Sequence, residues 1–407
     1  MNQIKQGYKQ TKVGIIPEDW EVVRLGDICI FYKGKGISKE NLSEEGIPCI
    51  RYGELYTTYN EKIDNVISKT NVDVKELFLS KSNDIIIPAS GETAIDIATA
   101  SCVLHDNIAL SGDLNVIRTK ENGIFLSYYL NVVAKHRIAS IAQGVSVVHL
   151  YSSQLENLFL SLPPLKEQEK IAEILTTWDE AITKQTELLE AKELLKKALM
   201  QKLLSGEVRF SGFSGEWKET KIGLICTIKT STSKSEFKSD DGTFFIVDMG
   251  SVSKDGELIV TKKTNIQKDM LNKDDLIMSK DDIGGGQIIG RTARIDCDNK
   301  YVMGDHVFLL QCKKDNPIFI HYLINSHSIN KSFRRKSTGT AQLGLNKKSV
   351  ETQMIICPDI KEQQKIAEVL SLADEEINLL KSELKELKLQ KKALMQKLLT
   401  GEVRVKV

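Results

Sequence analysis

The side chains best suited to chemistry in this sequence are basic, and they concentrate in two stretches that contain no carboxylate. No Asp or Glu occurs between Glu121 and Glu156, and none occurs between Asp315 and Glu351. Acidic residues make up 55 of 407 positions, so each stretch should hold about five of them if they were evenly spread. A surface that faces phosphate groups is expected to exclude carboxylates, because like charges repel.

The second stretch is the more basic of the two. A buried helix would also lack acids, but burial cannot hide the segments SFRRKS and NKKS, so phosphate contact is favoured here. The basic residues are Lys331, Arg334, Arg335, Lys336, Lys347 and Lys348. The first stretch contains only Lys135 and Arg137, beside His136 and His149. For this stretch, burial and phosphate contact remain equal alternatives.

Arginine adds a second kind of recognition, because its guanidinium can donate two parallel hydrogen bonds to a guanine edge. Arg51, Arg291 and Arg294 lie in the loop-like segments IRYGEL and GGGQIIGRTAR. An ordinary surface ion pair is the alternative for any one of them. Together with the basic residues of the two stretches, these three arginines form the predicted nucleic-acid-binding set.

No arrangement of residues indicates catalysis or a metal site. The sequence has no GxxxxGK[ST] loop, no GxSxG elbow, and glycines in DDIGGGQIIG that miss the GxGxxG spacing. The six histidines lack metal-ligand spacing, and no two of the seven cysteines form CxxC. We therefore predict no catalytic residue, no metal and no cofactor in this chain, although an unsignalled catalytic carboxylate remains an alternative.

Overall composition places few further limits on function. The net charge is +1, which neither favours nor excludes nucleic acid. No N-terminal apolar stretch resembles a signal peptide, and no run of about 18 apolar residues could span a membrane. Scattered single cysteines fit a reducing compartment. We expect a cytoplasmic protein.

Two blocks of the sequence recur at a constant separation of 195 residues. KEQEKIAEIL at 166–175 returns as KEQQKIAEVL at 361–370, and KKALMQKLLSGEVR at 196–209 returns as KKALMQKLLTGEVR at 391–404. Weaker matches precede each block and include Gly144 with Gly339. A period this long exceeds that of solenoid repeats, so the chain is interpreted as two copies of one unit.

Each recurring segment predicts a long helix. Apolar residues at alternating spacings of four and three form a coiled-coil seam, namely Ile366, Leu370, Ala373, Ile377, Leu380, Leu384 and Leu387 in the second copy and Ile171, Leu175, Trp178, Ile182 and Leu189 in the first. Gly206 and Gly401 follow at the expected C-cap positions. Each helix should hold about 38 residues, or roughly 57 Å. The two can pair antiparallel within one chain, and a simple oligomerisation stalk is the alternative.

The remaining parts predict an α+β fold. NDIIIPAS, DLNVIRT, DDLIMSK and HVFLLQC indicate strands, and one helix is expected in each unit, from GIFLSYYLNVVAKHRIASIA and PIFIHYLINSHSINKSFRRK. The predicted architecture is two similar globular α+β domains separated by two long α-helices that form an antiparallel coiled coil, with a pseudo-twofold internal duplication. The expected boundaries are 1–162 and 208–357 for the globular domains, and 163–207 and 358–407 for the helical segments.

The identity of the two helices exceeds what a seam requires. Four polar residues of each copy lie off the apolar stripe: Lys196, Lys197, Gln201 and Lys202 in the first, and Lys391, Lys392, Gln396 and Lys397 in the second. Two equal surfaces in one chain suggest two identical partners docked at equivalent places.

These twin motifs, with SGFSGEW opening the second unit, resemble the specificity subunits of type I restriction-modification systems over essentially the whole chain. The resemblance implies that each globular unit is a target-recognition domain for one half of a bipartite, asymmetric site in double-stranded DNA. It implies that the helices set the spacing and dock two modification (methyltransferase) subunits, which restriction (translocase/nuclease) subunits then join. S-adenosylmethionine, ATP and Mg would belong to those partners, and this chain would be non-catalytic. The alternatives are a nuclease or methyltransferase with an unrecognised site, and a coiled-coil scaffold without a DNA role.

Overall fold

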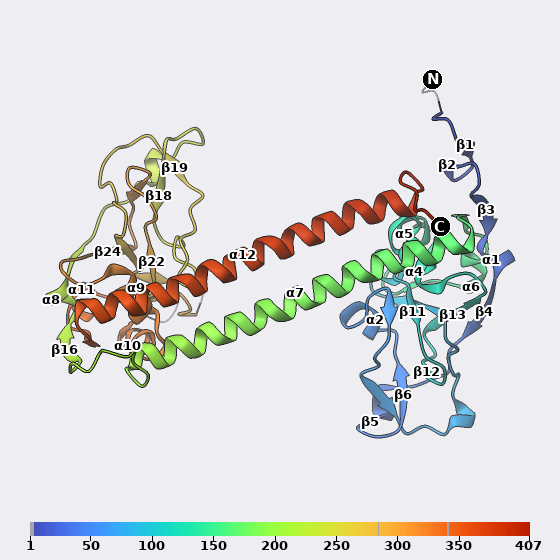
Figure 1. The fold of residues 1–407 in the computed structure, drawn as a ribbon, viewed down its shortest axis with the longest axis horizontal. Coiled ribbons are helices and arrows are strands. Elements are labelled where there is room, and N and C mark those ends of the chain that lie inside the picture. Colours follow the sequence, from blue (N-terminus) through green and yellow to red (C-terminus); the bar gives the residue numbers. More distant parts are fainter. Residues whose placement is uncertain (1–3, 284, 340–341) are drawn as a thin grey trace. The chain divides into compact units, whose positions relative to one another are not determined.

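The computed structural model describes residues 4–283, 285–339 and 342–407. The chain divides into two compact units: unit 1 comprises Met1–Thr186 and Ser382–Val407, and unit 2 comprises Glu187–Lys381. The two long helices are α7 (Leu165–Ser205) and α12 (Ile360–Leu399). Each unit therefore contains one globular domain, part of α7 and part of α12 (Figure 1).

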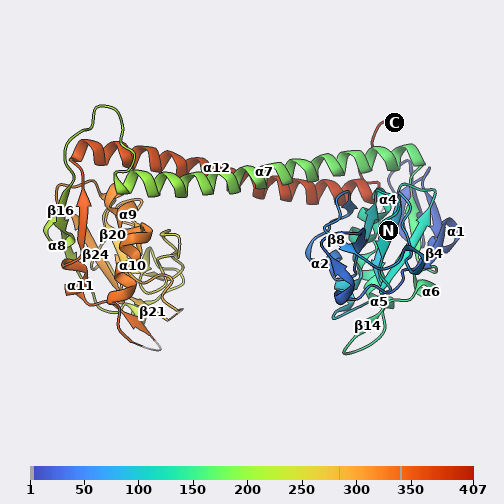
Figure 2. The ribbon, with the colours of Figure 1, turned by 90° about the horizontal axis from the view of Figure 1, so that it is seen from below.

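The domain of unit 1 is built on a five-stranded sheet and a four-stranded sheet. The first has the order β4 (Cys29–Lys33), β13 (Leu114–Thr119), β9 (Asp84–Pro88), β11 (Ser101–Val103) and β7 (Lys62–Ile63). The second has the order β12 (Ala109–Leu110), β6 (Ile47–Ile50), β8 (Ser68–Thr70) and β5 (Leu42–Ser43). Three two-stranded pairs complete it: β1 (Tyr8–Thr11) with β2 (Gly14–Pro17), β3 (Glu21–Arg24) with β15 (Phe159–Leu162), and β10 (Ser90–Gly91) with β14 (Val148–His149). β14 lies at the end of the domain remote from the long helices (Figure 2).

The domain of unit 2 repeats this plan with fewer strands. Its main sheet has the order β17 (Cys226–Lys229), β24 (Val307–Cys312), β20 (Leu276–Ser279) and β22 (Thr292–Arg294). A three-stranded sheet has the order β19 (Lys263–Thr264), β18 (Phe244–Val247) and β23 (Tyr301–Met303). The two-stranded pairs are β16 (Lys218–Lys221) with β26 (Met354–Cys357) and β21 (Asp281–Asp282) with β25 (Leu343–Gly344). The four predicted strand segments are confirmed as β9, β13, β20 and β24.

The prediction of one helix per domain is wrong, because each expected helix is broken in two. Unit 1 has α4 (Gly123–Val132) and α5 (Lys135–Ile141), and unit 2 has α9 (Pro317–Asn325) and α10 (His327–Lys336). In unit 2 the break falls at Ser326, whose backbone is extended at φ −60° and ψ 151°. Serine has only modest helix propensity, and the break lets α10 take a new direction.

Short helices occupy several of the remaining connections. In unit 1 these are α1 (Leu25–Ile28), α2 (Glu54–Thr57), α3 (Ala94–Ile97) and α6 (Ser152–Leu155). In unit 2 they are α8 (Ile222–Ile225) and α11 (Lys347–Glu351).

Within each unit, α7 and α12 pack antiparallel as predicted. In unit 1 Gln185 donates to Glu383 at 2.9 Å, and Asp179, earlier in α7, pairs with Lys391, later in α12. In unit 2 Lys192 pairs with Glu376 at 2.6 Å. Gly206 and Gly401, one or two residues beyond the helix ends, both have φ +73°, the left-handed conformation of a glycine C-cap.

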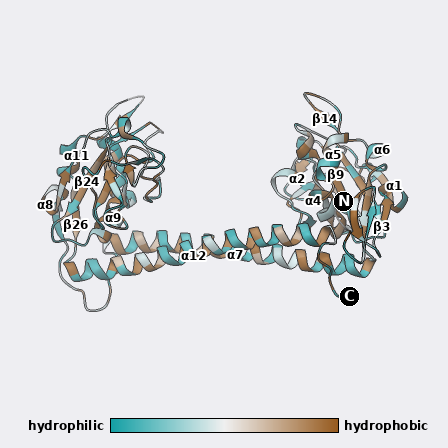
Figure 3. Ribbon diagram, turned by 90° about the horizontal axis from the view of Figure 1, so that it is seen from above, coloured by the Kyte–Doolittle hydropathy of each residue, from teal (hydrophilic) through white to brown (hydrophobic). Residues whose placement is uncertain are grey.

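The helices also complete the core of each domain. In unit 1, Leu175 and Leu399 are fully buried in the same cluster as Phe125. In unit 2, Leu203 and Leu370 join the cluster around Phe319. Hydrophobic residues concentrate in the sheets, whereas the long helices alternate polar and apolar residues (Figure 3). Among the described residues, no helix is both long and apolar enough to cross a membrane.

Candidate nucleic-acid interface and helix contacts

The predicted basic residues of the second stretch lie on α10 and α11 of unit 2. Lys331, Arg334, Arg335 and Lys348 are exposed. Two others are engaged locally, because Lys336 donates to Gln353 at 2.7 Å and Lys347 lies 3.6 Å from Glu351. α10 therefore presents a group of cations to solvent, as the sequence suggested.

The two loop arginines of unit 2 have different surroundings. Arg294 pairs with Asp274 at 2.8 Å, which is the ordinary ion pair that the sequence left open. Arg291 is half-buried and donates from Nη1 to the carbonyl of Asn325 at 3.0 Å, while its buried Nε has no hydrogen-bond partner within the described residues. Burial lowers the pKa of Arg291, and the positive charge of Arg334 lowers it further.

Unit 1 offers less basic surface at the corresponding places. Arg137 donates to the carbonyl of Phe159 at 2.6 Å and so ties α5 to β15, and Lys135 is only partly exposed. Most of α4 is buried, so burial explains the missing acids there. Arg51 lies between β6 and α2, where its backbone N–H donates to Glu54 at 3.1 Å. DNA contact by Arg51, Lys135 and Arg137 stays a prediction.

The first lysine of the repeated KKALMQKLL block forms contacts inside each unit. In unit 1, Lys391 and the Tyr128 hydroxyl both donate to Asp179, which joins α12, α4 and α7. In unit 2, Lys196 and Tyr322 bind Asp374 in the same way. Burial, followed by the carboxylate, raises the pKa of both tyrosines, so each retains its proton and donates.

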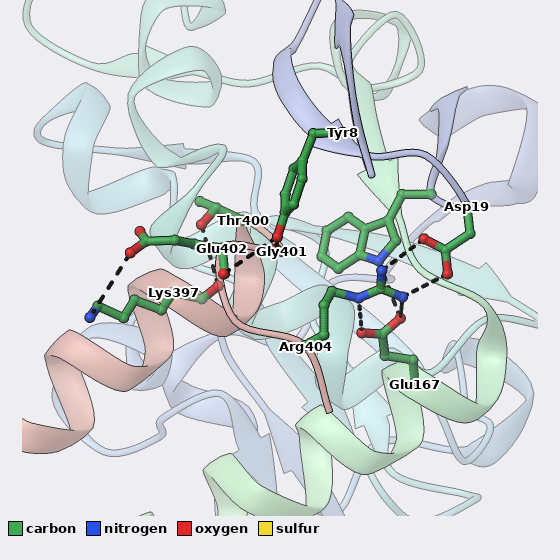
Figure 4. Close-up of polar contacts among 9 residues, drawn as sticks. Tyr8, Asp19, Glu167, Lys397, Thr400, Gly401, Glu402 and Arg404 are labelled. Carbon is green, nitrogen blue, oxygen red and sulfur yellow. Dashed lines mark hydrogen bonds and ion pairs between the residues drawn. The ribbon is translucent and has the colours of Figure 1, made fainter. Parts of the chain in front are cut away.

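The arginine that ends each repeated block clamps the start of the other long helix. In unit 1, Arg404 donates from Nε and Nη2 to Glu167 at 2.7 Å (Figure 4). Both terminal nitrogens of Arg404 also donate to Asp19. Trp20 donates to the same Glu167 carboxylate at 3.2 Å. The Glu167 side chain is only 1% exposed, so its charge depends on these donors. The hydrogen bonds that Arg404 donates to both carboxylates raise its pKa.

Unit 2 contains an equivalent Trp–Glu–Arg group. Arg209 donates to Glu362 at 2.9 Å and 2.7 Å, and Trp217 donates to the same carboxylate at 3.2 Å. The identity of Arg209 and Arg404 therefore has a reason inside the chain.

The other predicted docking residues remain exposed in both units. These are Lys197, Gln201 and Lys202 on α7, and Lys392, Gln396 and Lys397 on α12. Apolar positions of the same helices are exposed at equivalent places, with Leu194 68% and Leu389 53% accessible. Apart from Lys397, which lies 3.9 Å from Glu402, the described residues show no ion pair for these lysines. Intramolecular contacts thus do not explain why these positions are identical.

Sequence reasoning missed the acids, amides and aromatics that hold the units together. The missed pairs are Asp179 with Asp374, Glu167 with Glu362, Gln168 with Gln363, Tyr128 with Tyr322, and Asn131 with Asn325. Each pair is separated by 194 or 195 residues. Comparing every polar residue across the repeat, rather than the helix blocks alone, would have found them.

Within the described parts of the chain, no group of three or more His, Cys, Asp or Glu side chains could hold a metal ion. The distinctive features are therefore a duplicated scaffold, an exposed basic helix in unit 2 and two equivalent helix surfaces. Together they describe a recognition protein built from two related modules.

Comparison with known proteins identifies the class. The family model described as type I restriction modification DNA specificity domain matches twice, over residues 17–193 and 214–389. The chain belongs to this family and is a specificity subunit, the non-catalytic DNA-recognition component of a type I restriction-modification system.

Individual relatives cover nearly the whole chain. It is 28% identical over 430 residues to the type I restriction enzyme MjaVIII specificity subunit of Methanocaldococcus jannaschii, spanning 99% of this chain and 97% of the relative. It is 20% identical to the EcoKI specificity subunit of Escherichia coli, over 87% and 82% of the two chains. The crystal structure of the S subunit from M. genitalium has the same fold, with a TM-score of 0.64, 16% identity and 97% of each chain covered.

Proposed function

We propose that this specificity subunit directs its complex to a bipartite, asymmetric DNA target, with residues 1–162 reading one half and residues 208–357 the other. The observation that carries this proposal is one scaffold bearing two different surfaces. Asn131 bonds both backbone groups of Ala100, at 2.7 Å and 2.9 Å, and Asn325 bonds both of Thr292, each at 2.9 Å. These equivalent contacts give both domains the same backbone framework. The surfaces of the two domains differ, which suits two different half-sites.

In unit 2, α10 and α11 supply phosphate contacts in this proposal. Lys331, Arg334, Arg335 and Lys348 are exposed there, and each phosphate neutralised on DNA should add about 0.9 to the slope of log affinity against log salt. Replacing Arg334, Arg335 and Lys336 with alanine should flatten that slope by up to about three units across DNA sequences. An unchanged slope and affinity would remove α10 from the interface.

The two equivalent helix surfaces dock two modification subunits in this proposal. The exposed twin residues Lys197 and Lys392, with Gln201 and Gln396, support equal partners at two places. S-adenosylmethionine, ATP and Mg would be bound by the modification and restriction subunits. This chain would select the DNA site at which those subunits act.

The segments 163–207 and 358–407 act as a ruler between half-sites in this proposal. Inserting four residues into each helix adds about 6 Å, close to two base pairs at about 3.4 Å each. The target should then have a spacer longer by one or two base pairs and unchanged half-sites. Methylation at the original spacing by an active variant would contradict the ruler.

The decisive experiment is to coexpress this chain with its modification subunits and to map methylated adenines across a genome. We expect one bipartite motif with a fixed spacer, and substitutions of the α10 cations should weaken methylation without changing the letters of either half-site. Methylation or cleavage by the purified chain alone would instead support an enzyme. Absence of salt-dependent DNA binding by the assembled complex would support a scaffold.

A further inference from the structure

We propose that Arg291 and Arg334 form a clamp for a single DNA phosphate, present in unit 2 and absent from unit 1. The proposal rests on the DNA-binding function proposed above and assigns one ligand group to one pair of side chains. Arg291 immediately precedes β22, and Arg334 lies on α10.

Glycines bring the two arginines together. Gly290, at φ +69°, lies against α10, because a Cβ added there would stand 2.7 Å from the Cβ of Phe333. A Cβ added to Gly286 would stand 3.6 Å from Nε and 3.8 Å from Nη2 of Arg334. The loop that precedes Arg291 therefore packs against α10, and the charge of Arg334 lies near enough to act on Arg291.

Neither guanidinium has a carboxylate partner among the described residues. Arg334 is exposed, and no hydrogen bond or ion pair of its side chain occurs in the described parts of unit 2. Arg291 has one acceptor, the Asn325 carbonyl, and a buried Nε without a partner. Asp255 is the acidic group that opposes the mutual repulsion of the arginines.

An anion would satisfy this arrangement. Two like charges brought together without a carboxylate partner are unfavourable unless an anion binds beside them. A phosphate offers several acceptor oxygens and matches the planar fork of a guanidinium. At Gly285, with φ +81°, an added Cβ would meet no atom within 4 Å, so the backbone beside the arginines is open to a ligand.

Unit 1 lacks both arginines at the equivalent positions. The matching bonds of Asn131 to Ala100 and of Asn325 to Thr292 make the preceding residues, Thr99 and Arg291, equivalent. Ala139 and Arg334 each lie five residues before the paired glycines Gly144 and Gly339. The clamp therefore gives unit 2 a phosphate contact that unit 1 does not have.

The test measures DNA affinity of the assembled complex over a range of salt concentrations, with cognate and unrelated DNA. Arg334→Ala removes an exposed side chain, so its folding should be unaffected, and Arg291→Met removes the buried partner. Arg294→Met is the matched control, because Arg294 already pairs with Asp274. Thermal unfolding of each variant checks that the fold is retained.

Each clamp variant should flatten the salt slope by about 0.9, equally for both DNAs, and the control should not. The salt slope of the double variant should fall by about the same amount as that of either single variant, because both arginines bind the same phosphate. A slope change near two for the double variant would mean two separate contacts and would overturn the clamp. A loss confined to one letter of the target would make the pair a base reader and would also overturn it.

The result separates failure of the clamp from failure of the proposed function. If the unsubstituted complex shows no salt-dependent DNA binding, both the function and the clamp are refuted. If the complex binds DNA and Arg334→Ala leaves the slope unchanged, the clamp alone is refuted.

Discussion

Unit 1 and unit 2 share the contacts that attach a domain to two helices and differ in the surface that the domain presents. Both use a Tyr–Asp–Lys group and a Trp–Glu–Arg group, each joining three separate segments of the chain. Where unit 2 carries Arg291 and Arg334, unit 1 carries Thr99 and Ala139. Attachment is thus repeated, and recognition is free to diverge.

This comparison divides the residues of the repeated segments 196–209 and 391–404 into two sets. The first lysine and the terminal arginine of each copy are repeated because they hold a carboxylate within a unit. The exposed lysines and glutamines have no such internal reason among the described residues, and they carry the proposed docking role. The identity that first suggested docking is therefore explained in part by contacts within the chain.

The largest expected effect separates these two sets by charge reversal. Lys197→Glu with Lys202→Glu should remove one modification subunit, and Lys392→Glu with Lys397→Glu should remove the other, because each pair of lysines is exposed on one of the two surfaces. Native mass measurement of the complex would show the loss of one partner for each pair. Unchanged stoichiometry with all four lysines reversed would refute the docking surface.

A smaller effect is expected from breaking the Trp–Glu–Arg group of unit 1. Arg404→Ala leaves the buried Glu167 without its main donor and should cost about 2 kcal/mol, below the value for fully buried pairs because Arg404 is partly exposed. Hydrogen exchange should increase at the start of α7 and leave unit 2 unchanged. The double variant Glu167→Gln, Arg404→Met should be less destabilised than Arg404→Ala alone, and equal losses would mean that the buried charge is unimportant.

Much of this scaffold could be predicted from the sequence, because its causes are local. The strand β9, entirely buried, was visible as an apolar run, and the helix ends at Gly206 and Gly401 were visible as glycines after a periodic segment. The break between α9 and α10 was missed because nothing in the periodicity of this stretch signals it.

The functional contacts were harder to predict because they join three elements. Lys196 was assigned to a free surface because only the helix seam was considered, whereas Asp374 and Tyr322 come from other elements. Arg294 and Arg291 look alike in sequence, and only the structure shows that Asp274 occupies one of them. The charge content of the sequence identified the basic region. Which of its cations are unpaired depends on the position of acidic side chains in the folded chain.

Acidification should destabilise unit 2 more than unit 1, and this effect should be smaller than that of Arg404→Ala. Burial lowers the pKa of His321 to about 4, and the equivalent residue of unit 1 is Ser127. Because the folded pKa lies below the unfolded value of about 6.5, the neutral ring contributes stability above pH 6.5 that is lost as pH falls toward 4. The loss should be about 1 kcal/mol by pH 5, discounted because His321 is not a fully buried residue.

Hydrogen exchange of α9 relative to α4, corrected for intrinsic rates, measures this difference. His321→Ser places the unit 1 residue in unit 2 and should remove the additional pH dependence. If α9 and α4 lose protection in parallel in the unsubstituted protein, His321 does not titrate as described.

The smallest expected effect concerns Asp19, which gives Arg404 a second carboxylate in unit 1. A hydrogen bond from Arg404 lowers the pKa of Asp19, so the pair contributes stability above the unfolded pKa of about 3.9 that is lost as pH falls through the folded value. Asp19 is 55% exposed, and an exposed ion pair is worth about 0.5 kcal/mol. Asp19→Asn should therefore lower the unfolding free energy of unit 1 by about that amount at pH 7 and by progressively less as the pH falls below the unfolded pKa of about 3.9. Glu216, which precedes Trp217 as Asp19 precedes Trp20, forms no ion pair among the described residues of unit 2, so Glu216→Gln is the matched control and should have no effect. Equal losses from the two variants would show that the second carboxylate does not distinguish the units.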